Sequence, residues 1–275
     1  MQFADADPWA FPRLQLAAEE VPDNKIDGLA LTIQLLEGTG TVRVQFVEAN
    51  GAELFQYMDG DPAFDQLFSG AMDAVEAITG EAYLDDFDWN RFDRIIDVGG
   101  SRGTKSLAIL RSHPRLRALV FDRPAVIGQA RSFWKGKVDE ALLKRVEFVG
   151  GDLLEGVPAP ENERDIYLFM AVFHGLGDPD ARKVLENVQR AIGSGSATVL
   201  IVDAVAAKRG IDPSVAAFDM QMLVGTRGRE RTLPEWTALA ASAGFSIREV
   251  VDVRTFAKFI VLQPTHTRSG ATLNG

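Results

Sequence analysis

The sequence has no cysteine among its 275 residues and only three histidines. The absence of cysteine excludes disulfides, thiolate zinc sites, iron–sulfur clusters and a cysteine nucleophile. Long apolar runs are also absent, since none approaches the roughly 20 residues that a membrane-spanning helix needs. The first residues are acidic and do not form the basic start of a signal peptide. We therefore expect a cytoplasmic protein that binds neither a membrane nor a metal.

Positive charge is scarce as well. The chain carries 29 lysines and arginines against 39 acidic residues, which leaves a formal net charge of −10. Binding to nucleic acid depends on clustered basic residues, so this composition argues against a nucleic-acid partner. The length fits one large domain, or one domain with a smaller companion. The composition therefore predicts an acidic globular protein that acts on a small molecule.

Short apolar runs alternate with segments of helical spacing from residue 92 onward. Such alternation predicts βαβ units and a parallel sheet with helices on both faces. We accordingly predict an α/β fold of the doubly wound, Rossmann-like type, with a mostly parallel seven-stranded sheet and a short, partly helical N-terminal segment. The strands are expected at residues 94–99, 118–122, 146–149, 166–169, 198–202, 246–253 and 256–262.

Three parts of the chain differ in character. Residues 1–80 form an N-terminal segment, and from Asp23 to Phe46 neither a helical nor a strand period persists for long. Within this segment, Asp61 and Pro62 are typical of a helix start, and an apolar stripe follows over residues 62–79. Residues 81–263 hold the predicted sheet, and residues 264–275 form a polar tail.

A glycine-rich turn, Asp97-Val98-Gly99-Gly100-Ser101-Arg102-Gly103, follows the first predicted strand. Such a turn lets a ligand approach the backbone at the carboxyl end of the sheet, where doubly wound folds bind cofactors. Asp97 suits a ligand with a cationic end, and Asp122, which closes the next strand, can accept hydrogen bonds from both hydroxyls of a ribose. The alternative is a tight strand–helix turn without a ligand. The glycine spacing does not match G-x-G-x-x-G, which argues against a nicotinamide dehydrogenase.

Six segments, in the same order, resemble the motifs of one enzyme family. From about Leu54 to Leu262 the chain is similar to the class I S-adenosylmethionine-dependent O-methyltransferases of small-molecule, natural-product type. The turn at 97–103 resembles the family's D-V-G-G-G-x-G, and residues 173–178 stand where the family has L-H-D-W-x-D. The other four segments are Phe121–Val126 (family D-L-P-x-V), Gly151–Leu154 (G-D-M/F-F), Arg229–Thr232 (E-R-T) and Ala243–Phe245 (A-G-F).

This resemblance implies that S-adenosylmethionine is the cofactor and that a small molecule accepts the methyl group. The residues that it assigns to the cofactor are Asp97, Gly99, Gly100, Gly103, Asp122, Arg123, Asp152, Leu153 and Met170. The residues that it assigns to the acceptor are Phe68, Met72, Phe173, Asp219 and Met222. Phe68 and Met72 also lie on the apolar helical stripe, for which plain core packing is an equal explanation.

The resemblance further implies that His174 is the general base and that Asp203 orients it. An imidazole with a pKa of about 6.5 suits the removal of a proton from a phenol with a pKa of about 10. The other two histidines have simpler explanations. His113 precedes a proline at a helix end, where it would cap, and His266 lies in the tail.

Two of the matching segments also have structural explanations. Asp178, Pro179 and Asp180 are typical of an N-cap, a first helical position and a first-turn acid. Thr232 to Glu235 forms a capping box, so helix architecture can explain the E-R-T resemblance.

The chain departs from the family pattern around His174 and at its N-terminus. Gly175 and Leu176 replace an aspartate and a tryptophan, and Met170 replaces a cationic residue. A second acid, expected on the last strand near Phe259, is absent, so Asp203 is expected to serve alone. The first sixty residues are too few for the complete winged-helix dimerisation domain with which family members begin. A homodimer and a pairing with a longer subunit both stay open.

The function predicted from the sequence is methylation of a hydroxyl on a small aromatic or polyketide-like metabolite, with His174 as the base. Two alternatives stay open. One is a methyltransferase-fold biosynthetic enzyme that catalyses a non-methylating step, such as a decarboxylation, hydroxylation or pericyclic reaction. The other is a non-catalytic partner subunit.

Overall fold

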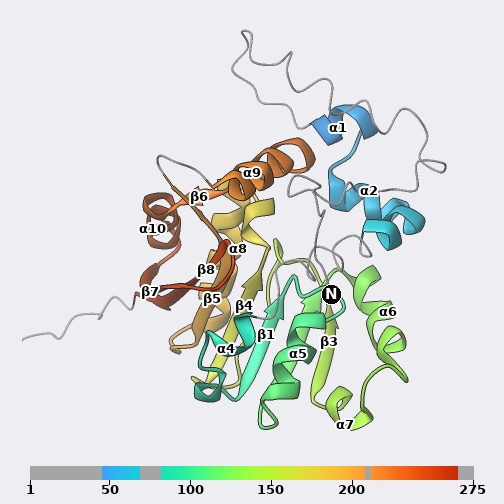
Figure 1. Cartoon of the computed structure of the whole chain (residues 1–275), viewed down its shortest axis with the longest axis vertical. Coiled ribbons are helices and arrows are strands. Elements are labelled where there is room, and N and C mark those ends of the chain that lie inside the picture. The colour runs from blue at the N-terminus through green and yellow to red at the C-terminus, as the bar shows by residue number, and fades with distance from the viewer. Residues whose placement is uncertain (1–44, 69–81, 208–211, 266–275) are drawn as a thin grey trace, which may run out of the picture. The chain divides into compact units, whose positions relative to one another are not determined.

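The computed structural model describes residues 45–68, 82–207 and 212–265, and the chain divides into two compact units (Figure 1). The N-terminal unit comprises residues 1–78 together with 224–226, and the sheet unit comprises residues 79–223 and 227–275. No helix in the described part of the chain combines the length and the apolar character needed to cross a membrane.

The N-terminal unit contains short helices with an aromatic cluster. The helices are α1 (Gln45–Asn50), α2 (Leu54–Gly60) and one over residues 62–68. Tyr57 packs edge to face on Phe46 and on Phe64, with ring centroids 5.5 and 5.3 Å apart. The helix start predicted at Asp61 is confirmed, because the Asp61 carboxylate accepts the backbone N–H of Phe64. Residues 69–79 of the predicted helix lie outside the described residues.

The predicted α/β fold and all seven predicted strands are confirmed. Their order across the sheet is β3-β2-β1-β4-β5-β8-β7, and β8 alone runs antiparallel to its neighbours. A two-residue strand, β6 (Arg231–Thr232), was not predicted and pairs with the end of β5. The strands are β1 (Arg94–Val98), β2 (Arg117–Asp122), β3 (Val146–Gly150), β4 (Asp165–Met170), β5 (Thr198–Ala206), β7 (Phe245–Asp252) and β8 (Ala257–Pro264).

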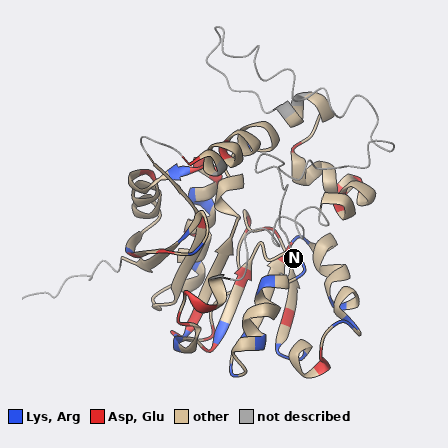
Figure 2. Cartoon of the chain, viewed as in Figure 1, with Lys and Arg blue, Asp and Glu red and all other residues tan. Residues whose placement is uncertain are grey.

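Helices cover both faces of the sheet, and charged groups of both signs are spread over its elements (Figures 1 and 2). All five residues of β1 are buried, as expected for a strand that is covered on both sides. Ile95 belongs to the core on one face and Ile96 to the core on the other. The helices are α4 (Ala82–Asp85), α5 (Thr104–Ser112), α6 (Pro124–Trp134), α7 (Glu140–Leu143), α8 (Asp178–Ile192), α9 (Pro213–Gly225) and α10 (Leu233–Ser242), with 3-10 turns η4 (Trp89–Arg91) and η5 (Phe173–Gly175).

The strand order determines where a ligand can be bound. The chain runs from β1 outward through β2 to β3, and then returns to β4 on the other side of β1. This reversal makes the carboxyl ends of β1 and β4 the switch point at which open α/β sheets bind ligands. The predicted glycine turn follows β1, and the turn with His174 follows β4. The fold therefore brings the two principal predicted motifs to the same edge.

Candidate active site

The glycine turn after β1 has backbone angles that residues with a side chain rarely adopt. Gly99 and Gly103 have φ angles of 75° and 83°, in the left-handed region that glycine adopts without steric cost. Gly100 lies directly against Asp97, because a β-carbon on Gly100 would lie 2.5 Å from the Asp97 carboxyl carbon. Ser101 also has a positive φ, of 51°, where the resembled motif has a glycine.

Two aspartates lie against this turn. Asp97 is only 2% exposed and accepts a hydrogen bond from the Ser106 hydroxyl at 2.7 Å, so its carboxylate lies beneath the turn. Asp122, at the end of β2, accepts the backbone N–H of Ser101 and that of Arg123, each at 2.7 Å. Since Asp122 is only partly buried, it presents an oriented carboxylate at the carboxyl edge of the sheet.

The remaining predicted cofactor residues lie at the ends of neighbouring strands. Arg123 is the N-cap of α6, directly after β2. Asp152 follows β3, is exposed, and accepts the backbone N–H of Leu154 at 2.8 Å. Leu153 is partly buried against the core, and Met170 is the last residue of β4. The structure thus collects these residues at the carboxyl edge of β2, β3 and β4.

The turn that carries His174 packs against the glycine turn. The chain leaves β4 through Ala171, whose φ of 55° is a second non-glycine value in the left-handed region. Val172 follows, and its side chain covers Gly99, where a β-carbon would lie 2.8 Å from Val172 Cγ2. His174 then lies in η5. The glycine at position 99 is therefore required by this contact as well as by its backbone angle.

Two buried carboxylates face the His174 imidazole. Its Nδ1 lies 3.2 Å from Glu230 Oε1 and 4.0 Å from Asp203 Oδ1. The side chains of both acids are 1% exposed, whereas that of His174 is 18% exposed. Asp203 also accepts the backbone N–H of Phe173 at 3.0 Å, which ties β5 to the histidine turn.

The carboxylates change the acid–base behaviour of the cluster. Burial alone lowers the pKa of His174, but Asp203, Glu230 and the Ala171 carbonyl outweigh burial and raise this pKa above its ordinary value. Burial raises the pKa of Asp203 to about 6, against the opposing effect of His174. His174 is consequently a stronger base than an isolated imidazole.

The expectation that Asp203 serves alone is wrong. Phe259 does lie on the last strand, fully buried, but the second acid comes from Glu230, just before β6. In the sequence, the E-R-T resemblance was the signal for Glu230. The capping box formed by Thr232 and Glu235 explained that match without a role for Glu230, so Glu230 was not predicted. The capping box is confirmed as well, so one segment both caps α10 and supplies a carboxylate to His174.

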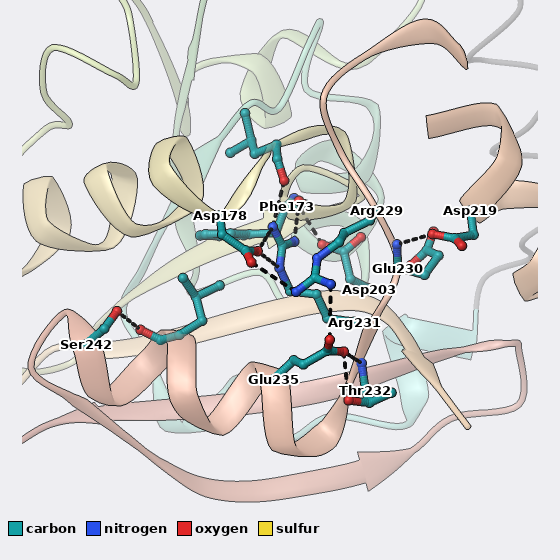
Figure 3. Close-up of polar contacts among 12 residues, drawn as sticks. Phe173, Asp178, Asp203, Asp219, Arg229, Glu230, Arg231, Thr232, Glu235 and Ser242 are labelled. Carbon is teal, nitrogen blue, oxygen red and sulfur yellow. Dashed lines mark hydrogen bonds and ion pairs between the residues drawn. The ribbon is translucent and has the colours of Figure 1, made fainter. Parts of the chain in front are cut away.

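Arg231, next to Glu230, forms hydrogen bonds with the backbone of the histidine turn (Figure 3). It is fully buried and donates to the carbonyl oxygens of Phe173 at 2.8 Å and Leu176 at 2.6 Å. It also donates to the Asp178 carboxylate at 3.0 Å. The N-cap role predicted for Asp178 is wrong, because Gly177 is the N-cap of α8 and the Asp178 carboxylate is committed to Arg231.

The predicted acceptor residue Phe173 belongs to the core. Its side chain is fully buried, with its ring centroid 5.0 Å from that of Phe169 and 5.9 Å from that of Trp236. The Phe173 side chain therefore has no exposed surface to offer an acceptor. Its contribution to the site comes from its backbone, which bonds to Asp203 and Arg231.

The other predicted acceptor residues lie in different places. Asp219 is exposed on α9 and accepts the backbone N–H of Glu230 at 2.8 Å, and Met222 is partly buried on the same helix. Phe68 is partly buried in the N-terminal unit, and Met72 lies outside the described residues. Asp219 is thus connected to the His174 cluster through its hydrogen bond with Glu230.

Comparison with known proteins defines the class. The model of the O-methyltransferase domain family matches residues 30–246, and the chain belongs to this family. Phenazine O-methyltransferase PhzM of Lysobacter antibioticus is 29% identical over 231 residues, which are 84% of this chain and 65% of that protein. The chain therefore spans less than two thirds of the length of this curated relative.

Solved structures agree with the assigned fold. The crystal structure of LaPhzM superposes with a TM-score of 0.80 at 26% identity, covering 88% of this chain and 70% of that one. The O-methyltransferase NcsB1 from neocarzinostatin biosynthesis superposes with a TM-score of 0.75 at 25% identity, covering 86% and 68%. That NcsB1 structure contains S-adenosyl-L-homocysteine and 1,4-dihydroxy-2-naphthoic acid.

Proposed function

We propose that this chain is an S-adenosylmethionine-dependent O-methyltransferase that acts on a hydroxyl of a small aromatic or polyketide-like metabolite. The observation that carries the proposal is the packing of the glycine turn against a turn whose histidine faces two buried carboxylates. A ligand-binding turn and a strengthened base are the two components that such a transfer needs. Membership of the O-methyltransferase domain family supports the same function.

The residues at the carboxyl edge fit S-adenosylmethionine. The three glycines let the turn pack closely on the side chains of Val172, Asp97 and Val120, which fixes its course at the carboxyl edge where doubly wound folds bind cofactors. Asp122, oriented by two backbone N–H groups, would accept hydrogen bonds from the ribose hydroxyls. Asp152 and Leu153 would border the adenine, and Arg123 and Met170 would complete the contacts. When bound, the cofactor supplies a methyl group on a positively charged sulfur.

His174 is proposed to take the proton of the acceptor hydroxyl. Its Nδ1 faces Glu230 and Asp203, so Nε2 is the nitrogen that receives the proton. The imidazolium formed in this way is stabilised by the two carboxylates. Loss of this proton to His174 would leave the acceptor oxygen able to take the methyl group, with the carbon–sulfur bond of the cofactor broken, its electron pair left on sulfur and S-adenosylhomocysteine released.

The acceptor is proposed to be a phenol-like molecule, because phenols need a base at neutral pH and imidazole is matched to that task. The naphthoic acid in the NcsB1 structure supports this chemical class. Asp219 and Met222 on α9 are the candidates for acceptor contacts.

Calorimetric titration with S-adenosylhomocysteine tests the cofactor assignment. Asp122→Asn should weaken binding by about tenfold to a hundredfold, since hydrogen bonds to a charged group contribute roughly 1.5–3 kcal/mol. Asp139→Asn is a matched control, because Asp139 also accepts a backbone N–H but does so as the N-cap of α7. Failure of the unaltered protein to bind S-adenosylhomocysteine would overturn the proposal.

Incubation with S-adenosylmethionine and 1,4-dihydroxy-2-naphthoic acid, together with a panel of other phenols, tests the reaction. Mass spectrometry should find a methylated product and S-adenosylhomocysteine in equal amounts. An altered but unmethylated product, or no turnover of any phenol, would contradict the proposed reaction and favour a non-methylating enzyme or a non-catalytic subunit.

A further inference from the structure

Gly228 makes a backbone contact with the histidine turn that leaves no room for a side chain. A β-carbon on Gly228 would overlap the carbonyl oxygen of His174 and lie 2.6 and 2.7 Å from the carbonyl carbon and Cα of Gly175. Real β-carbons do not approach other atoms within 3.0 Å, and backbone atoms cannot rotate away as a side chain can. Two stretches of main chain are therefore in direct contact beside the imidazole.

The segment that contains Gly228 is anchored immediately beyond this contact. The backbone N–H of Glu230 donates to Asp219 at 2.8 Å. The Arg231 guanidinium then donates to the carbonyl oxygens of Phe173 and Leu176, which flank the histidine. Because the Glu230 bond connects the segment to α9 and the Arg231 bonds connect it to the histidine turn, the segment cannot move away as a whole to make room for a side chain at Gly228.

We propose that Gly228 and Arg231 are positioning residues that set the separation between the His174 imidazole and the Glu230 carboxylate. Gly228 allows the two main chains to touch, and Arg231 holds the turn in that place through its bonds to Phe173 and Leu176. Arg231 suits this task because its planar fork of donors reaches two carbonyls and the Asp178 carboxylate at once. The inference rests on the proposed function in one respect, namely that His174 acts as the base.

Substitution of Gly228 by alanine tests the proposal, and Gly225 is the matched control. Gly225 lies three residues earlier, and a β-carbon on it would have no described atom within 4 Å. In Gly228→Ala the added carbon should separate His174 from Glu230, so the His174 pKa should fall and kcat should drop by about tenfold to a hundredfold. Gly225→Ala should retain the His174 pKa and the rate of the unaltered protein.

The measurements are an NMR titration of the His174 imidazole, kcat for a phenol methylated by the unaltered protein, and calorimetric affinity for S-adenosylhomocysteine. A merely structural role for Gly228 would lower the amount of folded protein but leave the pKa of His174 unmoved in the folded fraction. An unchanged His174 pKa and an unchanged kcat in folded Gly228→Ala would overturn the proposal.

Arg231→Lys extends the test if Gly228→Ala does not fold. Lysine keeps the positive charge next to Asp178 but loses the fork that spans Phe173 and Leu176. It should lower the His174 pKa and kcat in the same direction, and values equal to those of the unaltered protein would overturn the proposal. The proposed function fails separately, if His174→Ala keeps its full rate, and the pKa changes of the positioning variants do not depend on that outcome.

Discussion

Charged side chains are buried both at the amino edge of the sheet, where parallel strands such as β1 and β4 begin, and at the carboxyl edge, where they end. The partners of the buried acids differ between these two edges. At the amino edge, Arg94 of β1 lies beside Asp165 of β4 and donates two hydrogen bonds to its carboxylate, at 3.0 and 2.7 Å. Arg94 is 5% exposed and Asp165 has no exposed surface. At the carboxyl edge, Asp203 and Glu230 face His174 instead. Both edges therefore contain buried acids beside a positive or potentially positive group.

The difference lies in whether the partner can change its protonation. A guanidinium stays charged at all ordinary pH values, and Arg117 and Arg94 hold the pKa of Glu161 at the amino edge below its usual range. An imidazole titrates near neutral pH, and its acids move that titration upward. The amino edge is thus a permanent ion pair that holds strands together, whereas the carboxyl edge is a cluster that can accept and release a proton.

The largest expected effect is a loss of kcat when His174, the partner that can titrate, is replaced. His174→Ala should lower kcat by about 10²- to 10⁴-fold, the usual contribution of a general base, with S-adenosylhomocysteine affinity unchanged. His113→Ala is the control, because His113 is the C-cap of α5 as predicted and should leave the rate unaltered. A His174→Ala enzyme with full kcat for the same phenol would remove the proposed base.

Replacement of Arg94, the partner whose charge is permanent, should lower the stability of the protein and leave kcat unchanged. Arg94→Met leaves Asp165 buried without its cation and should lower the free energy of unfolding by about 3–5 kcal/mol, measured by urea denaturation. The folded fraction should keep the kcat and the His174 pKa of the unaltered protein. The double variant Arg94→Met with Asp165→Leu should recover part of the loss. A reduced kcat in folded Arg94→Met would break the distinction between the edges.

The smallest expected effect concerns backbone strain, which also differs between the edges. Ser101 and Ala171 are the non-glycine residues with positive φ in the described chain, and both lie in turns at the carboxyl edge. Ser101→Gly should raise the free energy of unfolding by up to about 1 kcal/mol, because relief of left-handed strain exceeds the entropy that glycine adds to the unfolded chain. A clear loss of stability in the same urea experiment would show that the serine is not strained.

Much of the sheet follows from local sequence patterns, but the partners of His174 do not. Buried runs such as 94–99 predict strands because length and flanking turns suffice, and the glycines at 99–103 mark the turn directly. Asp203 could be predicted because it matches an acid of the resembled family, although β5 continues past it to Ala206. Glu230 lies before a two-residue strand that has no periodicity, and only tertiary packing brings it to His174. Arg231 contradicts the usual exposure of arginine, so its burial was not predictable from its type.

For two further residues, a local sequence pattern predicted a role that a contact with a distant segment overrides in the structure. Asp178 has the sequence context of an N-cap, yet its carboxylate binds Arg231, a residue 53 positions later in the chain. Phe173 occupies a motif position next to the base, yet its ring packs in the core against Trp236 of α10. In both cases the competing contact comes from a distant segment, α10 or β6, whose approach no local pattern encodes.

An NMR titration of the histidine side chains tests the central claim most directly, because it needs no knowledge of the acceptor. The chain has three histidines, His113, His174 and His266, so single substitutions assign every signal. A carboxylate stabilises the protonated imidazole, so His174 should titrate above the ordinary value of about 6.5, and Glu230→Gln should lower its pKa. A His174 pKa at or below the ordinary value, or one that Glu230→Gln leaves unmoved, would contradict the account.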